Sequence, residues 1–371
     1  MNFDFSDEVK QLQDQARRFL GEHSTPGQVR EVLDGAMPFR RELWQGMAEL
    51  GWQGAAIPEE FGGAGLGYEA LCVLAEELGR SLAPVPFASS VYLASEVFLQ
   101  CGSDAQRRQW LPQLAAGKLI GTLAWAEGAG NPDERGIKAR VAGGRLTGGK
   151  WPVPDGGIAD IAVVAARGET DGIVLALADL RGEGVQRTDL KTIDPTKQHA
   201  RIEFNRAPVE VLGRAADGWA TLRQVLDRAA VLVAFEQIGG AAACLAMATD
   251  FAKQRYAFGR PIGSFQAIKH KLADVYIATE LARSNAYYGA WALSRGAAEL
   301  PLAAAAARVS ATEAFYLAAK ENIQTHGGMG FTWAADCHLF YRRAKLLALT
   351  LGSASHWKNR LVTELEMRNA A

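Results

Sequence analysis

Two segments in the second half of the chain carry residue types that can bind a phosphate-bearing ligand. The first, RYAFGRPIGSFQ, begins at Arg255, and the second, QTHGG, begins at Gln324. The guanidinium of Arg255 is a permanent cation whose planar donors suit phosphate oxygens. Glycine lets a backbone approach a ligand closely and a glutamine amide supplies hydrogen bonds, so Gln324, Gly327 and Gly328 suit the same chemistry.

Each of these residues also has an ordinary structural explanation. Arg255 could be a surface arginine that caps a helix end, and Phe258 could belong to a hydrophobic core. Gly327 and Gly328 could simply form a turn between two helices. His326, inside the second segment, is better interpreted as a turn histidine than as a catalytic one.

Composition limits the kinds of protein to consider. The chain has 371 residues, enough for two or three structural units with substantial cores. Apolar residues make up 49% and charged residues 22%, which is ordinary for a globular protein. The formal net charge of -1 gives no indication of nucleic acid or an anionic membrane as the main partner.

The cysteines and the N-terminal segment indicate a reducing compartment. The cysteines are scattered and form neither a CxxC pair nor a cluster with metal-ligand spacing, so free thiols and no metal site are expected. The first residues, MNFDFSDEVKQLQDQARRFL, are charged and amphipathic rather than typical of a signal peptide. No stretch approaches about 18 uninterrupted apolar residues, so we expect a cytoplasmic protein without a membrane span.

Hydrophobic periodicity divides the chain into three parts. The first part is helical, with Ser6 as the expected N-cap of a helix, and its predicted helices are Asp7–Gly21, Phe39–Gly51, Tyr68–Leu82, Ser90–Cys101 and Asp104–Ala116. Short alternating runs then predict antiparallel strands, with examples at Ile158–Arg167, Gly172–Leu180 and Ala200–Val209. Long helices return as Trp219–Gln254, Ser264–Ser294, Leu300–Thr325 and Asp336–Arg368.

This order predicts a mainly α protein with a central β domain. The expected boundaries are a helical domain at 1–117, a β domain at 118–217 and a helical bundle at 218–371. Many helix faces in the last part are alanine-rich, and small residues permit the close helix–helix approach found in a bundle.

Four segments in this order resemble the acyl-CoA dehydrogenase family across essentially the whole chain. They are Leu50–Arg80, Gly102–Gly130, Arg255–Asp274 and Glu321–Lys345, of which the last two are the most specific. The resemblance implies a helical N-terminal domain, a small β-barrel and a C-terminal four-helix bundle. It also implies paired subunits with FAD lying across the pair: the flavin ring mainly in one β domain, the ADP end largely on the neighbour's bundle.

The resemblance assigns roles to particular residues of this chain. Arg255 matches the pyrophosphate-binding arginine, and Phe258 matches an aromatic residue that packs on the cofactor. The remaining matches to cofactor contacts are Phe265, Gln266, Gln324, Gly327 and Gly328, together with Trp151 of a second motif.

The residues expected around the flavin ring are altered. The family's flavin loop usually reads TEPGAGSD, whereas this chain reads AEGAGNPD, so Ala126 replaces a threonine and the expected serine is replaced near Asn131. The family's WITN motif reads WPVPD here, which keeps Trp151 but places Val153 where a threonine is expected. Neither Ala126 nor Val153 has a side-chain donor, so a flavin would lose two hydrogen bonds there.

The expected catalytic base is absent from both positions that the family uses. In one subgroup a glutamate follows the YRDAK motif, and the matching residue here is Leu351; in another it lies in LDxER, and the match is Ala229. Leucine and alanine cannot accept a proton, so no catalytic residue is assigned. Glu236 and Asp227 are the nearest carboxylates along the helix, but Glu236 lies about 10 Å farther on and Asp227 points elsewhere.

Three hypotheses follow from this pattern. The leading one is a base-lacking partner subunit, which completes the FAD site of a homologous base-bearing subunit in a heterotetramer; heteromeric members of the family act on bulky CoA thioesters such as steroid side chains. The second is a homo-oligomeric, homotetrameric FAD enzyme with another base or other oxidative chemistry. The third is a non-catalytic acyl-CoA-binding or structural protein. For the first two, the family implies an acyl-CoA substrate and an electron-transferring flavoprotein as electron acceptor.

Overall fold

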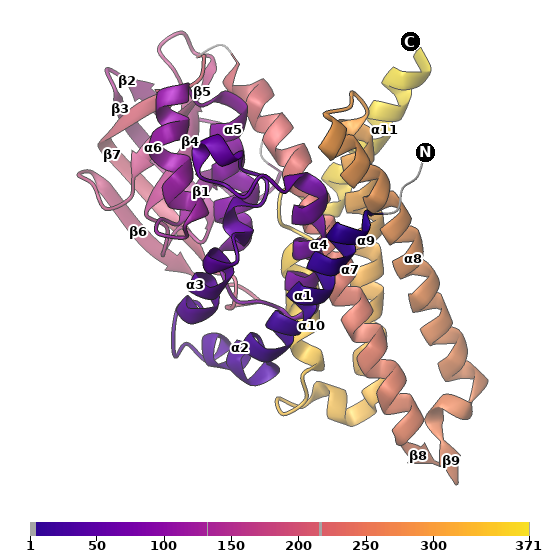
Figure 1. Ribbon diagram of the computed structural model, residues 1–371. Coiled ribbons are helices and arrows are strands. Elements are labelled where there is room, and N and C mark those ends of the chain that lie inside the picture. The colour runs from indigo at the N-terminus through magenta and orange to yellow at the C-terminus, as the bar shows by residue number, and fades with distance from the viewer. Residues whose placement is uncertain (1–4, 132, 215–216, 371) are drawn as a thin grey trace. The chain divides into compact units, whose positions relative to one another are not determined.

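The computed structural model of the chain describes residues 5–131, 133–214 and 217–370 (Figure 1). Its helices are α1 (Asp7–His23), α2 (Pro26–Leu33), α3 (Arg41–Glu49), α4 (Gly67–Arg80), α5 (Glu96–Cys101), α6 (Asp104–Ala115), α7 (Gly218–Gln254), α8 (Gln266–Arg295), α9 (Leu300–His326), α10 (Cys337–Leu347) and α11 (Ala354–Ala370). Its strands are β1 (Gly121–Ala124), β2 (Arg140–Ala142), β3 (Arg145–Pro154), β4 (Ile161–Arg167), β5 (Ile173–Asp179), β6 (Val185–Leu190), β7 (His199–Leu212), β8 (Tyr256–Ala257) and β9 (Arg260–Pro261).

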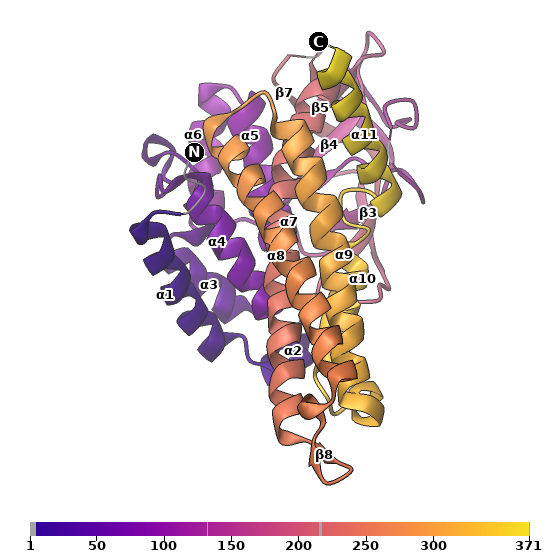
Figure 2. The ribbon, with the colours of Figure 1, turned by 90° about the vertical axis from the view of Figure 1, so that its right-hand side faces the viewer.

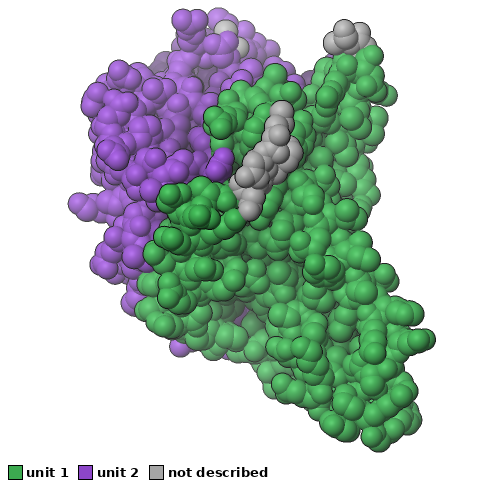
Figure 3. All heavy atoms as spheres, turned by 45° about the vertical axis from the view of Figure 1, so that its right-hand side comes forward, with its two compact units in different colours: residues 1–30, 72–83, 230–371 green, residues 31–71, 84–229 purple. Residues whose placement is uncertain are grey.

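The chain divides into two compact units (Figure 3). Unit 1 comprises residues 1–30, 72–83 and 230–371, and unit 2 comprises residues 31–71 and 84–229. The three domains expected from the sequence, 1–117, 118–217 and 218–371, remain a prediction, because the two units are assembled from discontinuous segments.

The strands of unit 2 close into a small barrel. β4 pairs with β5, β5 with β7, β7 with β3, β3 with β2, and a single pairing of Arg140 with Arg167 returns from β2 to β4. β1 adds to β4 in parallel and β6 adds to β7. The first six residues of both β4 and β5 are buried, so these strands read as apolar runs rather than as an alternating pattern.

The long helices of unit 1 form an antiparallel bundle (Figure 2). α7 and α9 run in the same direction, since Gln237 meets Thr312 and Phe251 meets His326 farther along both helices. α8 runs the opposite way, because Lys271 near its start pairs with Glu321 near the end of α9 at 3.3 Å. Small residues allow the close approach: a Cβ on Gly240 of α7 would lie 2.4 Å from the ring of Phe315.

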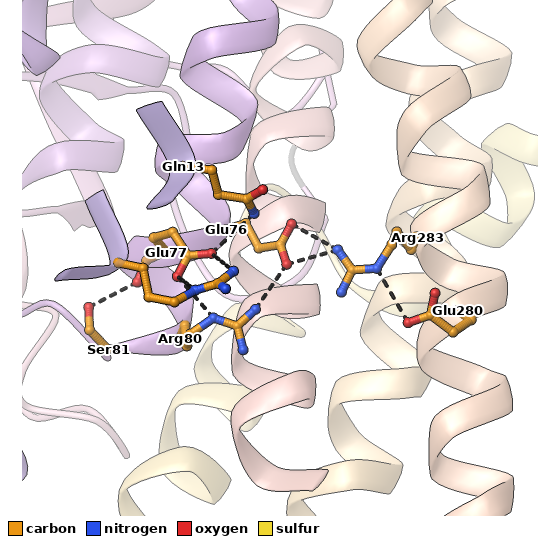
Figure 4. A network of polar contacts seen from close by, with 8 residues as sticks. Gln13, Glu76, Glu77, Arg80, Ser81, Glu280 and Arg283 are labelled. Carbon is orange, nitrogen blue, oxygen red and sulfur yellow. Dashed lines mark hydrogen bonds and ion pairs between the residues drawn. The ribbon is translucent and has the colours of Figure 1, made fainter. Parts of the chain in front are cut away.

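Two buried carboxylates on α4 tie α1 and α8 to this helix within unit 1 (Figure 4). The carboxylate of Glu76 lies between two guanidiniums, Arg80 at 3.1 Å and Arg283 at 2.8 Å. Glu77 pairs with Arg17 of α1 at 2.8 Å and with Arg80 at 2.9 Å. Both carboxylate side chains are only 1% exposed, so the charges satisfy the requirement that buried ions be paired.

α7 is the one helix among the described residues that is long and apolar enough to cross a membrane. Within the protein, however, 72% of its most apolar stretch is buried. The core helix of a soluble protein passes the same test of length and composition, so this feature is weak support for a membrane span.

The structure corrects the predicted helices at three places. The predicted single helix Asp336–Arg368 is wrong: the chain breaks between α10 and α11, where Leu351 and Gly352 have φ of +64° and +115°. The segment Ser90–Cys101 is helical, but its first part is π-helical over Ala88–Ser95. The helix α2 was missed. The predicted N-cap is confirmed, since the Ser6 hydroxyl accepts a hydrogen bond from the Val9 amide.

Candidate functional site

Seven of the predicted cofactor residues lie at one end of the bundle in unit 1. The end of α7, the start of α8 and the end of α9 meet there because the helices alternate in direction. The ring of His326 stacks on Phe251 with centroids 4.2 Å apart, and its Nδ1 lies 2.8 Å from the carbonyl of Asn322. These contacts support the interpretation of His326 as a structural turn histidine that joins α7 to α9.

Phe258 occupies the turn of a two-stranded hairpin that connects α7 to α8. β8 and β9 pair antiparallel, and the two residues between them, Phe258 and Gly259, have φ of +53° and +79°. Such a turn normally requires glycine, asparagine or aspartate, because a side chain in the left-handed region is strained. Phe258 is nevertheless 95% exposed, so it is not a core residue. A strained and exposed aromatic residue indicates a function beyond packing.

Arg255 has a fixed backbone and an exposed side chain. Its amide donates to the carbonyl of Phe251 at 2.8 Å, and its own carbonyl accepts from the amide of Ile262 at 2.8 Å. Within the part of the chain that the structure describes, no hydrogen bond or ion pair engages its guanidinium. The side chain is therefore available to a ligand, and the alternative of a helix-capping arginine has no support in the contacts.

The segment after α9 leaves room above its backbone. Gly327 has φ of +60°, a conformation in which a side chain is strained, and its amide closes the helix by donating to the carbonyl of Gln324. A Cβ placed on Gly327 or Gly328 would meet no atom within 4 Å. The side chain of Gln324 is exposed beside this open backbone.

The remaining two predicted residues flank the hairpin. The guanidinium of Arg260 stacks over the ring of Phe265 at 4.1 Å, and that ring meets Phe258 edge-on with centroids 6.2 Å apart. Gln266 begins α8 with an exposed side chain. Together, this end of the bundle presents a free cation, exposed aromatic rings, an exposed amide and an open glycine backbone. That set fits the phosphate-bearing half of a dinucleotide.

The flavin-loop residues and Trp151 lie in unit 2, where they form a separate group. The Trp151 amide donates to the carbonyl of Ala126 at 2.9 Å, and the Gly128 amide donates to the carbonyl of Trp151 at 3.0 Å. The two motifs are therefore side by side, as a shared ligand edge requires. Ala126 is 6% exposed and Val153 fully buried, and neither offers a polar side-chain atom. The side chains here do not fit a flavin ring that needs hydrogen-bond donors.

Sequence reasoning missed an ion pair that shapes this loop. The Lys150 ammonium lies 2.6 Å from the Glu127 carboxylate, which also accepts the amides of Lys138 at 2.8 Å and Ala139 at 2.9 Å. Residues of this loop, from Trp125 to Lys138, line a partly open pocket of about 270 Å³. The available signal was a lysine directly before Trp151, but its partner lies 23 residues away.

Electrostatics keep the Glu127 carboxylate ionised. Burial by itself raises the pKa of Glu127, but the hydrogen bond and charge of Lys150 and the two backbone amides outweigh it, so the pKa is lowered overall. Three donors, the Lys150 ammonium and the amides of Lys138 and Ala139, therefore hold the ionised Glu127 carboxylate in place.

The two positions where the family resemblance places a base are both apolar and buried. Ala229 of α7 is fully buried, and Leu351, between α10 and α11, is 5% exposed. Glu236 is 1% exposed, and its Oε1 has no hydrogen-bond partner among the described residues. Asp227 is also buried, at 4% exposure.

Beside Ala229, unit 2 contains a charged cluster that the sequence did not indicate. Arg228 donates to Glu96 at 2.5 Å and to the Tyr68 hydroxyl at 3.1 Å, and the Tyr68 hydroxyl donates to Glu96 at 2.9 Å. Burial lowers the pKa of Arg228, but the Glu96 charge raises it above its ordinary value overall. The Glu96 carboxylate is thus paired with a cation and accepts a hydrogen bond from a phenol.

Histidine, cysteine and carboxylate side chains form no metal-binding group among the described residues. Residues 5–131, 133–214 and 217–370 therefore contain no candidate metal site, and the absence of a metal from the whole chain remains a prediction.

Sequence comparisons with known proteins agree with this architecture. The family models for the acyl-CoA dehydrogenase N-terminal and C-terminal domains match residues 6–118 and 216–362. A relative named acyl-CoA dehydrogenase IpdE2, from Mycobacterium tuberculosis, is 32% identical over 97% of this chain and 98% of its own length.

Two solved structures are similar along their whole length. A steroid ACAD variant, Tcur3481-Tcur3483, superposes with a TM-score of 0.89 and 32% identity, covering 98% of this chain and 99% of that one. The ChsE4-ChsE5 complex from Mycobacterium tuberculosis superposes with a TM-score of 0.89 and 28% identity, covering 99% of each chain.

Proposed function

The chain belongs to the acyl-CoA dehydrogenase family of FAD-dependent oxidoreductases acting on CH–CH donors, and from this premise we propose that it is a partner subunit. In this role it completes the FAD site of a homologous subunit that bears the catalytic base, and it supplies no base itself.

One observation carries the proposal. Both base positions hold buried apolar side chains, Leu351 and Ala229, whereas at the bundle end the Phe258 ring is 95% exposed and the Arg255 guanidinium has no hydrogen bond or ion pair among the described residues. Proton abstraction needs a titratable group within hydrogen-bond reach, which these two positions cannot provide. A phosphate, in contrast, finds a free cation and an open glycine backbone at the bundle end.

Each predicted residue at the bundle end has a proposed role in binding the cofactor. Arg255 would bind the pyrophosphate, Gln324 would hydrogen-bond it, and Gly327 and Gly328 would let the backbone approach it. Phe258, Phe265 and Gln266 would contact the adjoining part of the dinucleotide. FAD, when bound, supplies the hydride acceptor for the oxidation. In this assignment the chain's own residues bind and orient the cofactor, and the partner's carboxylate takes the proton.

The remaining details extend the family's properties to this chain. The substrate would be an acyl-CoA thioester, and the similarity to a steroid ACAD favours a bulky, ring-bearing acyl group. The assembly would be a cytoplasmic heterotetramer with an electron-transferring flavoprotein as acceptor. The resemblance to a two-chain complex, ChsE4-ChsE5, supports the heteromeric arrangement.

The test is to purify the chain alone and together with a homologous subunit that has glutamate at either base position. We expect no stoichiometric flavin absorbance from the chain alone. The co-expressed complex should contain half as many FAD molecules as chains, and these should be reduced by acyl-CoA.

Three other outcomes would oppose this assignment. Stoichiometric flavin and acyl-CoA turnover by the chain alone would refute the partner role. Flavin that resists acyl-CoA but consumes oxygen with another substrate would favour a homo-oligomeric enzyme with different chemistry. No flavin in either preparation would favour a non-catalytic protein.

A further inference from the structure

The break between α10 and α11 is held by a buried arginine on a distant helix. Arg308 of α9 is 1% exposed, and all the hydrogen bonds of its two terminal nitrogens are made inside unit 1. Nη1 donates to the Gln237 side-chain oxygen and, at 2.7 Å, to the Thr312 hydroxyl. Nη2 donates to the carbonyls of Leu347 and, at 2.8 Å, of Thr350.

The two sides of the guanidinium therefore grip different parts of the bundle. The Nη1 side binds α7 and α9, whereas the Nη2 side binds the last residue of α10 and the link that follows it. The final carbonyls of a helix have no partner within the helix, so a donor is needed wherever they are buried. Arg308, which lies 39 residues before Leu347 in the sequence, supplies that donor.

The link has a strained backbone at the residue that follows these carbonyls. Leu351 has φ of +64° although it is a leucine, and its side chain is 5% exposed. A left-handed conformation in a non-glycine residue persists only where the surroundings enforce it. The carbonyl of Thr350, the residue just before Leu351, is one of the two that Arg308 holds.

We propose that Arg308 is the positioning residue of the α10–α11 link and holds position 351 in its left-handed conformation. The inference rests on the proposed function in one respect, namely that position 351 is where a base-bearing relative would have its glutamate. On this view the chain has lost the base but kept the structure that orients the residue at that position.

Geometry rather than charge explains why an arginine stands at this position. Burial lowers the pKa of Arg308, and the negative charge of Glu236 opposes that shift. An arginine can satisfy four acceptors in two directions because its guanidinium is a rigid fork, whereas a lysine ammonium acts from one point. The arrangement therefore depends on arginine in particular, not merely on positive charge.

The test compares three variants of the full chain by hydrogen–deuterium exchange, read at the amides of Leu349, Thr350 and Gly352. Arg308→Met removes both sides of the clamp, and Arg308→Lys keeps the charge but not the fork. Gln237→Leu is the matched control, because it removes an acceptor on the Nη1 side and leaves both link carbonyls bound.

We expect the link amides to exchange about ten- to a hundredfold faster in R308M, the range for loss of hydrogen bonds to a charged group. The amides of α9 should stay protected, R308K should be intermediate, and Q237L should match the wild type at the link. Unchanged link exchange in R308M, or equal acceleration of the link and α9, would overturn the proposal.

Arg308→Met leaves the carbonyls of Leu347 and Thr350 without this donor, so R308K serves if R308M does not fold. A link in R308K that is as protected as in the wild type also contradicts the clamp. Because the exchange is measured without flavin or partner, failure here is distinct from failure of the partner-subunit assignment, which appears as flavin bound and turned over by the chain alone.

Discussion

Removing the Arg255 guanidinium should lower FAD affinity of the proposed complex without affecting the fold of this chain. The side chain is exposed, and no hydrogen bond or ion pair engages it within the described residues. Arg255→Ala should therefore change the stability of the isolated chain by no more than about 0.5 kcal/mol, as expected for a surface substitution.

The effect on the cofactor follows from the same geometry. A hydrogen bond to a charged group contributes about 1.5–3 kcal/mol, which corresponds to about 10- to 150-fold in the FAD dissociation constant. The backbone of Arg255 is fixed by two hydrogen bonds of 2.8 Å, so only its exposed side chain has to be ordered when FAD binds.

The assay is a titration of the flavin-free complex with FAD, followed by the change in flavin fluorescence, with Arg295→Ala as the matched control. Arg295 is also exposed but ends α8, whose 30 residues place it about 45 Å from the hairpin end. R295A should bind FAD as the wild type does. Equal FAD affinity in R255A and R295A would refute the assignment of Arg255 to the phosphate.

Three further predictions concern the stability of the chain itself, each measured by thermal or chemical unfolding. Gly239→Ala should destabilise unit 1 by about 1–3 kcal/mol, because its Cβ would lie 1.8 Å from the carbonyl oxygen of Glu76. The control is Gly21→Ala on α1, whose Cβ would meet nothing within 4 Å, so this variant should be neutral or stabilising by about 0.5 kcal/mol. Comparable losses of stability in both variants would disprove the close helix crossing. Leu351→Gly should be more stable than Leu351→Ala by about 1 kcal/mol, the reverse of the usual order, because only glycine relieves the left-handed φ of +64°; the usual order would contradict the strain. The pKa of Glu127 is lowered in the folded chain, so its stabilising contribution is complete above the ordinary value of 4.5 and is lost as the pH falls through the lowered value. Lys150→Met should cost about 1–3 kcal/mol at neutral pH and flatten this acid dependence, and an unchanged acid profile would count against the pair.

The sequence predicted much of the candidate site because its signals are local. Arg255, Phe258, Gly327 and Gly328 all lie in short motifs whose residues stay together in the folded chain. Leu351 and Ala229 are apolar, so these two side chains exclude proton transfer wherever the chain places them. The assignment of these motifs to a cofactor remains a prediction for the titration to test.

Contacts between distant residues could not be predicted in the same way. Glu127 and Lys150 are 23 residues apart, and Arg308 is 42 residues from Thr350, so no periodicity connects them. The predicted helix Asp336–Arg368 failed for this reason: its pattern is helical on both sides of the break, and the arginine that holds the break lies on another helix. Likewise, the close crossing of α4 and α7 depends on Gly79 and Gly239 meeting backbone oxygens of the other helix.

By itself, the order of residues determined the succession of helical, β and helical segments, the family, and the apolar side chains at the two positions where the family resemblance places a base. Those properties depend on side-chain type and on spacing within a turn or a strand, which the sequence carries directly. Only the tertiary structure decided which charges are paired, which backbone carbonyls are held, and which arginine stays free for a ligand. Such outcomes depend on burial and on partners brought together from far along the chain, and an arginine in a sequence reads the same whether it clamps a link, as Arg308 does, or faces solvent, as Arg255 does.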